Sequence, residues 1–231
     1  MFRKYAGFTI LFASIAALQL CSIYGGYSLL HIITKVMITL SLMITLVFTT
    51  RLRGRFHKRV FAGLLFAMAG DIFLLMDSES GYFMAGLGCF LIGHLCYISA
   101  FYLDFRSAPE LDKKGARLAI LAGIILSCGF YLWLRPYLGP LRLPVLTYIF
   151  VITLMMMMAA FRNLRVDTLS FKLILAGAVC FMASDAMLAS DRFIAHFPNS
   201  GLAIMFTYML AQYLIVIGAM ERTLIIRDPL V

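Results

Sequence analysis

The chain of 231 residues is 63% hydrophobic and only 13% charged, with a mean hydropathy of +0.95. Soluble domains carry about 25% charged and 45–50% apolar residues, so this composition excludes a soluble protein and indicates an all-α integral membrane protein. The formal net charge of +9 therefore indicates basic loops and contact with anionic membrane lipids rather than a nucleic-acid partner.

Eight segments are apolar and long enough to cross a bilayer, which takes about 20 residues. They cover residues 6–24, 29–50, 60–77, 81–103, 117–134, 144–161, 171–190 and 201–221. These spans leave no room for a soluble domain, so residues 1–231 are expected to form a single transmembrane domain. No small-residue cleavage site follows the first segment, and we expect it to remain as a span rather than act as a signal peptide.

The basic residues divide unequally between alternate connections. One side receives Arg3, Lys4, Arg51, Arg53, Arg55, Lys58, Arg59, Arg106, Lys113, Lys114, Arg117, Arg162, Arg165, Lys172, Arg222 and Arg227. The other side receives Arg135, Arg142 and Arg192. The positive-inside rule then predicts that both termini lie in the cytoplasm. We expect a multi-pass protein of a bacterial inner (cytoplasmic) membrane.

An acidic pattern in the third span returns in the seventh. Met68, Ala69, Asp71, Leu74 and Asp77 align with Met182, Ala183, Asp185, Leu188 and Asp191. A separation of four spans preserves helix direction, so the pattern predicts a parallel four-plus-four pseudo-repeat. Membrane proteins commonly build their sites between such repeats.

Two carboxyl groups and a cation are predicted to share one layer of the membrane. Asp71 and Asp185 each lie six residues before the outer end of a span, about 9 Å below that boundary, and Lys35 has a similar depth. Each charged side chain at membrane depth costs about 2.5–3.5 kcal/mol on insertion scales, so each needs a structural or functional reason. A purely structural pair between Lys35 and one aspartate would leave the other acid unexplained.

Other polar side chains accompany the two acids. His94 lies deeper in the fourth span, Tyr208 and Gln212 lie at comparable depths in the eighth, and Tyr148 lies near the outer layer of the sixth. Each could bind substrate or could serve only in packing or interhelical hydrogen bonds. Small residues flank both aspartates, and because small residues let helices approach closely, we expect them to bring the two carboxyl groups toward a common cavity. Asp77, Glu79 and Asp191 are interpreted as caps or turn residues.

The sequence lacks the motifs that several classes of membrane hydrolase require. Intramembrane zinc hydrolases need a cluster of histidines and carboxylates, whereas this chain has four histidines, of which only His94 lies deep in a span. The sequences that flank the aspartates of intramembrane aspartyl proteases are missing, and no G-x-S-x-G motif is present. A proton-coupled transporter also suits paired membrane acids, and a lipid-binding scaffold without turnover is a third alternative.

The sequence combines G-D at 70–71, F-x-x-G-L-x-x-F at 83–90, G-H-x-x-Y at 93–97, S-D at 184–185 and Y-x-x-A-Q at 208–212 with Lys35 and Tyr148. This combination resembles the YhhN-like lysoplasmalogenase family. The resemblance implies an eight-span membrane enzyme that hydrolyses the vinyl ether bond of alkenyl-lysophospholipids. The products would be a fatty aldehyde and glycerophosphoethanolamine or glycerophosphocholine.

The resemblance also implies roles for the residues. The family's paired aspartates map onto Asp71 and Asp185 as catalytic residues. Substrate contacts would come from Lys35, His94, Tyr148, Tyr208 and Gln212. One protonated and one ionised aspartate would supply the acid and the base that this hydrolysis needs, without a metal or an organic cofactor. We assign Asp185 as the acid and Asp71 as the base, as a hypothesis.

Overall fold

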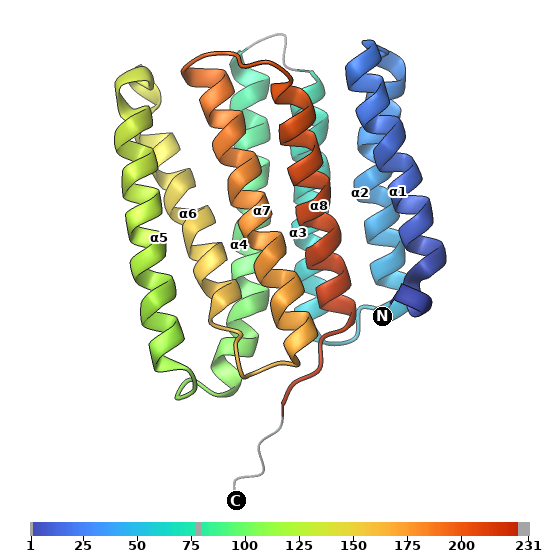
Figure 1. Ribbon diagram of the computed structural model, residues 1–231, viewed down its shortest axis with the longest axis vertical. Helices are drawn as coiled ribbons and strands as arrows, with labels where there is room; N and C mark the ends of the chain where they lie inside the picture. The colour runs from blue at the N-terminus through green and yellow to red at the C-terminus, as the bar shows by residue number, and fades with distance from the viewer. Residues whose placement is uncertain (1, 77–79, 226–231) are drawn as a thin grey trace, which may run out of the picture.

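A computed structural model of the protein describes residues 2–76 and 80–225, and within this part of the chain the fold is a bundle of eight long α-helices (Figure 1). The helices are α1 (Phe2–Gly25), α2 (Ser28–Thr50), α3 (Gly54–Leu75), α4 (Ser80–Ser107), α5 (Lys113–Leu134), α6 (Arg142–Ala160), α7 (Thr168–Phe193) and α8 (Ser200–Met220). Two short 3-10 helices, η1 (Arg135–Tyr137) and η2 (Gly139–Leu141), connect α5 to α6. The predicted all-α fold is confirmed.

Each predicted span coincides with one of these helices. Seven helices are apolar and long enough to cross a membrane, as a multi-pass membrane protein requires. The exception in the described chain is α3, because its first turns carry Arg55, Lys58 and Arg59 and its C-terminal half carries Asp71. This helix starts at Gly54 rather than at residue 60, since the basic residues continue it beyond its apolar part. Residues 77 and 79, interpreted above as turn residues, lie outside the described part.

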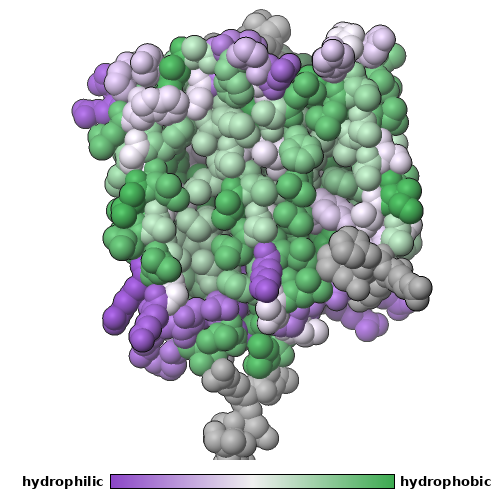
Figure 2. All heavy atoms as spheres, viewed as in Figure 1, coloured by the Kyte–Doolittle hydropathy of each residue, from purple (hydrophilic) through white to green (hydrophobic). Residues whose placement is uncertain are grey.

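Successive helices run in opposite directions, so α1 begins and α8 ends at the same end of the bundle (Figure 1). The basic connections between α2 and α3, α4 and α5, and α6 and α7 lie at this end too. Figure 2 shows a broad hydrophobic belt with hydrophilic side chains gathered at the two ends of the bundle. This distribution is the one expected of helices surrounded by lipid, because apolar side chains face hydrocarbon while charges remain near water.

Glycines let each aspartate-bearing helix pack closely against the helix that follows it. A Cβ atom on Gly70 of α3 would lie 2.8 Å from the ring of Phe90 in α4. A Cβ atom on Gly177 of α7 would lie 2.9 Å from the backbone oxygen of Ala211 in α8. The small residues therefore bring together α3 with α4 and α7 with α8. The two carboxyl groups line a common cavity, as expected and as described below.

A buried ionic cluster joins the connections at the end of the bundle where the termini lie. Asp104 of α4 accepts hydrogen bonds from Arg162 Nε at 2.8 Å and from Arg222 Nε at 2.7 Å. Arg162 also donates to the hydroxyl of Ser170 at 2.9 Å and lies against the ring of Phe56. Burial lowers the pKa of the Arg162 guanidinium, and the adjacent Asp104 carboxylate opposes that shift. One carboxylate thus holds the segments after α6 and α8 against α4.

The contact between α7 and α8 predicts a difference between two glycine-to-alanine substitutions. We expect Gly177→Ala to lower the stability of the protein by about 1–3 kcal/mol, because the new methyl group would meet backbone that cannot move aside. Gly129→Ala in α5 is the matched control, since its new methyl group would meet no described atom within 4 Å. Thermal unfolding in detergent measures both, and a Gly177→Ala protein as stable as the control would contradict this account of helix packing.

The ionic cluster predicts a large effect of removing its carboxylate. Asp104→Ala should cost about 3–5 kcal/mol, because two arginines would be left without a buried counter-charge. Glu110→Ala serves as the control. Glu110 pairs with Lys113 at 3.1 Å, but both side chains are largely exposed, so its loss should cost less than about 1 kcal/mol. Equal thermal stability of the two variants would show that the cluster does not hold this end of the bundle together.

Candidate functional site in the membrane-embedded bundle

Asp71 lies on α3 and is bound by side chains from two other helices. Its Oδ2 atom accepts a hydrogen bond from the hydroxyl of Tyr208 in α8 at 2.6 Å and one from Thr39 in α2 at 3.3 Å. The ammonium of Lys35, also in α2, lies 3.7 Å from Oδ1. Asp71 is only 2% exposed, so these partners compensate for removing its charge from water. The lysine therefore pairs with Asp71 rather than with Asp185.

A chain of buried polar side chains extends behind Tyr208. Gln212 donates from Nε2 to the Tyr208 hydroxyl at 3.4 Å and accepts a hydrogen bond at 2.7 Å from the hydroxyl of Tyr97 in α4. Gln212 is fully buried and lines neither of the two cavities that adjoin the aspartates. Its place suits it to orient Tyr208, and through it Asp71, rather than to contact a substrate directly.

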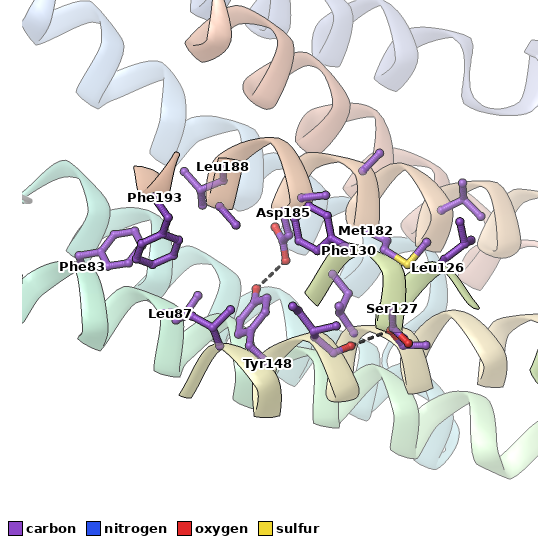
Figure 3. Close-up of a pocket in the computed structure, with 18 residues that line it drawn as sticks. Phe83, Leu87, Leu126, Ser127, Phe130, Tyr148, Met182, Asp185, Leu188 and Phe193 are labelled. Carbon is purple, nitrogen blue, oxygen red and sulfur yellow. Dashed lines mark hydrogen bonds between the residues drawn. The ribbon is translucent and has the colours of Figure 1, made fainter. Parts of the chain in front are cut away.

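Asp185 on α7 has a different set of partners. Its Oδ2 atom accepts a hydrogen bond from the hydroxyl of Tyr148 in α6 at 2.5 Å (Figure 3). The Nε2 atom of His94 in α4 lies 3.8 Å from the same oxygen. His94 is almost completely buried, packs edge-on against Phe181 and Tyr148, and has no hydrogen-bond partner among the described residues on either ring nitrogen. A tyrosine and an imidazole therefore adjoin Asp185, whereas a lysine adjoins Asp71.

Both aspartates line one cavity of about 810 Å³, which we call the polar cavity. Lys35 and Tyr208 lie in its wall together with Phe90, Ser184 and Leu188. It reaches the turn between α1 and α2 and the connection between α7 and α8, at the end of the bundle opposite the chain termini (Figure 1). The cavity thus connects the two carboxyl groups with the end of the molecule that carries few basic residues.

A second cavity of about 260 Å³ lies among α4, α5, α6 and α7, and we call it the apolar cavity (Figure 3). Figure 3 shows Asp185 and Tyr148 facing each other amid side chains such as Leu87, Met182 and Phe193. Asp185 and Leu188 line both cavities. Asp185 therefore stands where a polar space and an apolar space meet.

The structure places the predicted site residues near the two aspartates, but they do not all line the same cavity. Lys35 and Tyr208 line the polar cavity, and Tyr148 lines the apolar cavity. His94 lies 3.8 Å from Asp185 and Gln212 adjoins Tyr208, and neither residue lines one of these two cavities. Sequence reasoning missed Thr39 as a partner of Asp71, although it lies four residues after Lys35 and so shares a helix face with it. Asp191, interpreted as a cap or turn residue, lies in the last turn of α7 and accepts a hydrogen bond from the Phe197 amide at 3.3 Å. Sequence reasoning did not predict that it also lines the polar cavity.

These features define a class: a multi-pass helical membrane protein in which two aspartates inside the bundle line one cavity. The sequence model of the YhhN family matches residues 30–219, and the chain belongs to this family. A lysoplasmalogenase of Mycobacterium bovis is 32% identical over 166 residues, which are 71% of this chain and 61% of that protein.

Human relatives match to a similar extent. The human lysoplasmalogenase TMEM86A is 34% identical over 175 residues, covering 74% of this chain and 67% of the relative. The human lysoplasmalogenase TMEM86B is 30% identical over 170 residues, covering 73% and 66%. The chain thus spans less than two thirds of the length of the mycobacterial relative and about two thirds of the human ones. No solved structure matches it.

The ion pair beside the polar cavity predicts energetic coupling between Lys35 and Asp71. We expect Lys35→Met and Asp71→Asn each to lower stability, because each leaves a buried partner unsatisfied. The double variant should lose less than the sum of the two, by about 0.5–3 kcal/mol. Unfolding in detergent of the four proteins provides the coupling energy, and strictly additive losses would mean that the two side chains do not interact.

Proposed function

We propose that this protein is a lysoplasmalogenase, which hydrolyses the vinyl ether bond of alkenyl-lysophospholipids to a fatty aldehyde and glycerophosphoethanolamine or glycerophosphocholine. One observation carries the proposal: Asp71 and Asp185, inside the helical bundle of a membrane protein, line the same cavity. The curated relatives from bacteria and human, named as lysoplasmalogenases, support it. The substrate class also suits a cavity inside a membrane-embedded bundle, because a lysolipid reaches it from the surrounding bilayer.

The chemistry requires an acid and a base but no redox partner. A proton adds to the vinyl carbon beta to the ether oxygen and leaves an oxocarbenium ion. Water attacks this cation and gives up a proton, which forms a hemiacetal. The hemiacetal breaks its bond to the glycerol oxygen, which takes a proton, while its own hydroxyl becomes the carbonyl of the aldehyde. Two carboxyl groups in different protonation states can deliver the first proton, stabilise the cation and accept the proton of water.

The surroundings of the two aspartates support Asp185 as the acid and Asp71 as the base. The ammonium of Lys35 next to Asp71 favours its carboxylate form by direct attraction of charge. Asp185 instead borders the apolar cavity, whose hydrocarbon walls disfavour a charged carboxylate. The hydrogen bond that Asp185 accepts from Tyr148 favours the carboxylate, so in this proposal the apolar surroundings outweigh it and keep Asp185 protonated until the substrate accepts the proton.

The remaining site residues would act at different distances from the substrate. Lys35 and Tyr208, which line the polar cavity, would contact the glycerol or phosphate oxygens. Tyr148 would contact the chain beside Asp185. His94 and Gln212 would position the acids and tyrosines that they adjoin, since both are buried behind them. These assignments need neither a metal nor an organic cofactor.

The helix contacts support the proposed four-plus-four repeat. Asp71 of α3 takes its partners from α2 and α8, and Asp185 of α7 takes its partners from α6 and α4. In a four-plus-four repeat, α3 corresponds to α7, α2 to α6 and α8 to α4. The helices that supply the partners of Asp71 therefore correspond to those that supply the partners of Asp185. We propose eight spans, with α3 among them, both termini in the cytoplasm and, in a bacterium, insertion in the inner membrane; the basic connections at the end with the termini support this orientation.

Replacing either acid tests the proposed function. Asp71→Asn and Asp185→Asn should each reduce aldehyde release from an alkenyl-lysophospholipid by about 10²–10⁴-fold, the usual contribution of general acid or base catalysis. The purified proteins are assayed in detergent after size-exclusion chromatography has shown that they are folded.

Asp112→Asn is the matched control. Asp112 caps the start of α5 through a 3.0 Å hydrogen bond from the Gly115 amide, and asparagine caps helices as well as aspartate does. This variant should retain its activity. Full turnover by both Asp71→Asn and Asp185→Asn would refute the proposed catalytic pair.

A further inference from the structure

The acid–base steps assign no part of the substrate to the apolar cavity, although Asp185 forms part of its wall. Among the described side chains that line it, Asp185 is the only charged one, and most of the others are aliphatic or aromatic. A cavity with such walls favours hydrocarbon over water, since water needs two to four polar partners to occupy a site. Its contents must therefore be sought among apolar groups.

The two cavities lie on neighbouring faces of α7. Ser184, Leu188 and Asp191 follow one another at the helical spacing of four and three residues and line the polar cavity. Met182, Ala186 and Ala189 follow the same spacing and line the apolar cavity. Asp185 and Leu188 lie at the border and line both. A single molecule that occupies both spaces must therefore pass the carboxyl group of Asp185.

The apolar cavity also borders the outer surface of the bundle. Leu126 of α5 and Val179 of α7 line it, yet their side chains are 54% and 45% exposed. In a membrane this surface faces the hydrocarbon of the lipids. A chain within the cavity can therefore continue between α5 and α7 into the bilayer without contact with water.

We propose that the apolar cavity binds the hydrocarbon chain of the lysolipid while the polar cavity binds its glycerophosphate headgroup. This inference rests on the proposed function and extends it. The bond between headgroup and chain then lies beside Asp185, because this residue stands at the border of the two spaces. At about 260 Å³ the cavity is smaller than the roughly 300–1,000 Å³ of most small-molecule sites. It therefore holds the first part of the chain, and the rest leaves between Leu126 and Val179.

Photolabelling tests the location of the chain without requiring turnover. The probe is a lysophosphatidylethanolamine with a saturated alkyl ether, which lacks the vinyl bond, and a diazirine in the chain close to the glycerol. Labelled peptides are mapped by mass spectrometry with and without excess unlabelled alkyl-ether lysolipid. Some of the label will be lost when the competitor is present. We expect this competed label to lie on α5, α6 and α7, at residues such as Leu126, Ile152 and Met182. Competed label confined to other helices, or no competed label, would overturn the inference.

A pair of matched variants sharpens the test. Ala183 lines the apolar cavity, whereas Ala176, two turns earlier on α7, does not line it. Each methylene group of the lipid chain that is excluded from an apolar site lowers the affinity about fourfold. The phenyl ring introduced by the substitution would exclude at least two such groups. Ala183→Phe should therefore reduce competed labelling by about tenfold, and Ala176→Phe should leave it unchanged. Equal labelling of the two variants would refute the chain site.

The two proposals fail in different ways. A protein that binds the probe in the apolar cavity but releases no aldehyde would refute the proposed hydrolase and leave the chain site standing. A protein that releases aldehyde but carries its competed label elsewhere would refute the chain site alone.

Discussion

The arrangement of this bundle depends on two carboxyl groups that the fold keeps inside apolar surroundings. A charged side chain at membrane depth is costly unless it is paired or hydrogen-bonded. Asp71 meets Lys35 and Tyr208, and Asp185 meets Tyr148. Every one of these partners comes from a helix other than the one that carries the acid. Satisfying the two acids therefore fixes how α2 and α8 face α3, and how α6 faces α7, while the space between them stays open as the polar cavity.

The two acids share this cavity, but their surroundings differ, and this difference makes a division of work chemically reasonable. Asp71 lies beside a fixed cation and is connected through Tyr208 and Gln212 to a buried hydrogen-bond chain. Asp185 stands at the border of a space lined mainly by hydrocarbon. A lysolipid has the same division along its length, from a polar headgroup to an apolar chain, and its vinyl ether lies where the two parts join. The proposed reaction and the proposed chain site both follow from this correspondence.

The sequence predicted those features that depend on local composition. Hydropathy located seven of the helices in the described chain and the apolar part of α3, because an apolar run of sufficient length must satisfy its backbone polar groups within itself. Two acids inside such runs were conspicuous. The contacts between distant segments could not be predicted in this way. Nothing local indicates that Lys35 pairs with Asp71, that Gly177 packs on α8, or that Asp104 binds two arginines beyond α6 and α8. The apolar cavity escaped notice for the same reason, since its wall is made of ordinary aliphatic and aromatic residues from four helices.

The fate of the proton that reaches the substrate tests the central claim most directly. The purified protein is incubated with an alkenyl-lysophospholipid in deuterium oxide, and the fatty aldehyde is trapped as it forms and analysed by mass spectrometry. Protonation of the vinyl carbon by an exchangeable carboxyl group predicts aldehyde with one deuterium on the carbon next to the carbonyl. Release of aldehyde without deuterium at this carbon, or no release from a folded protein, would contradict the account.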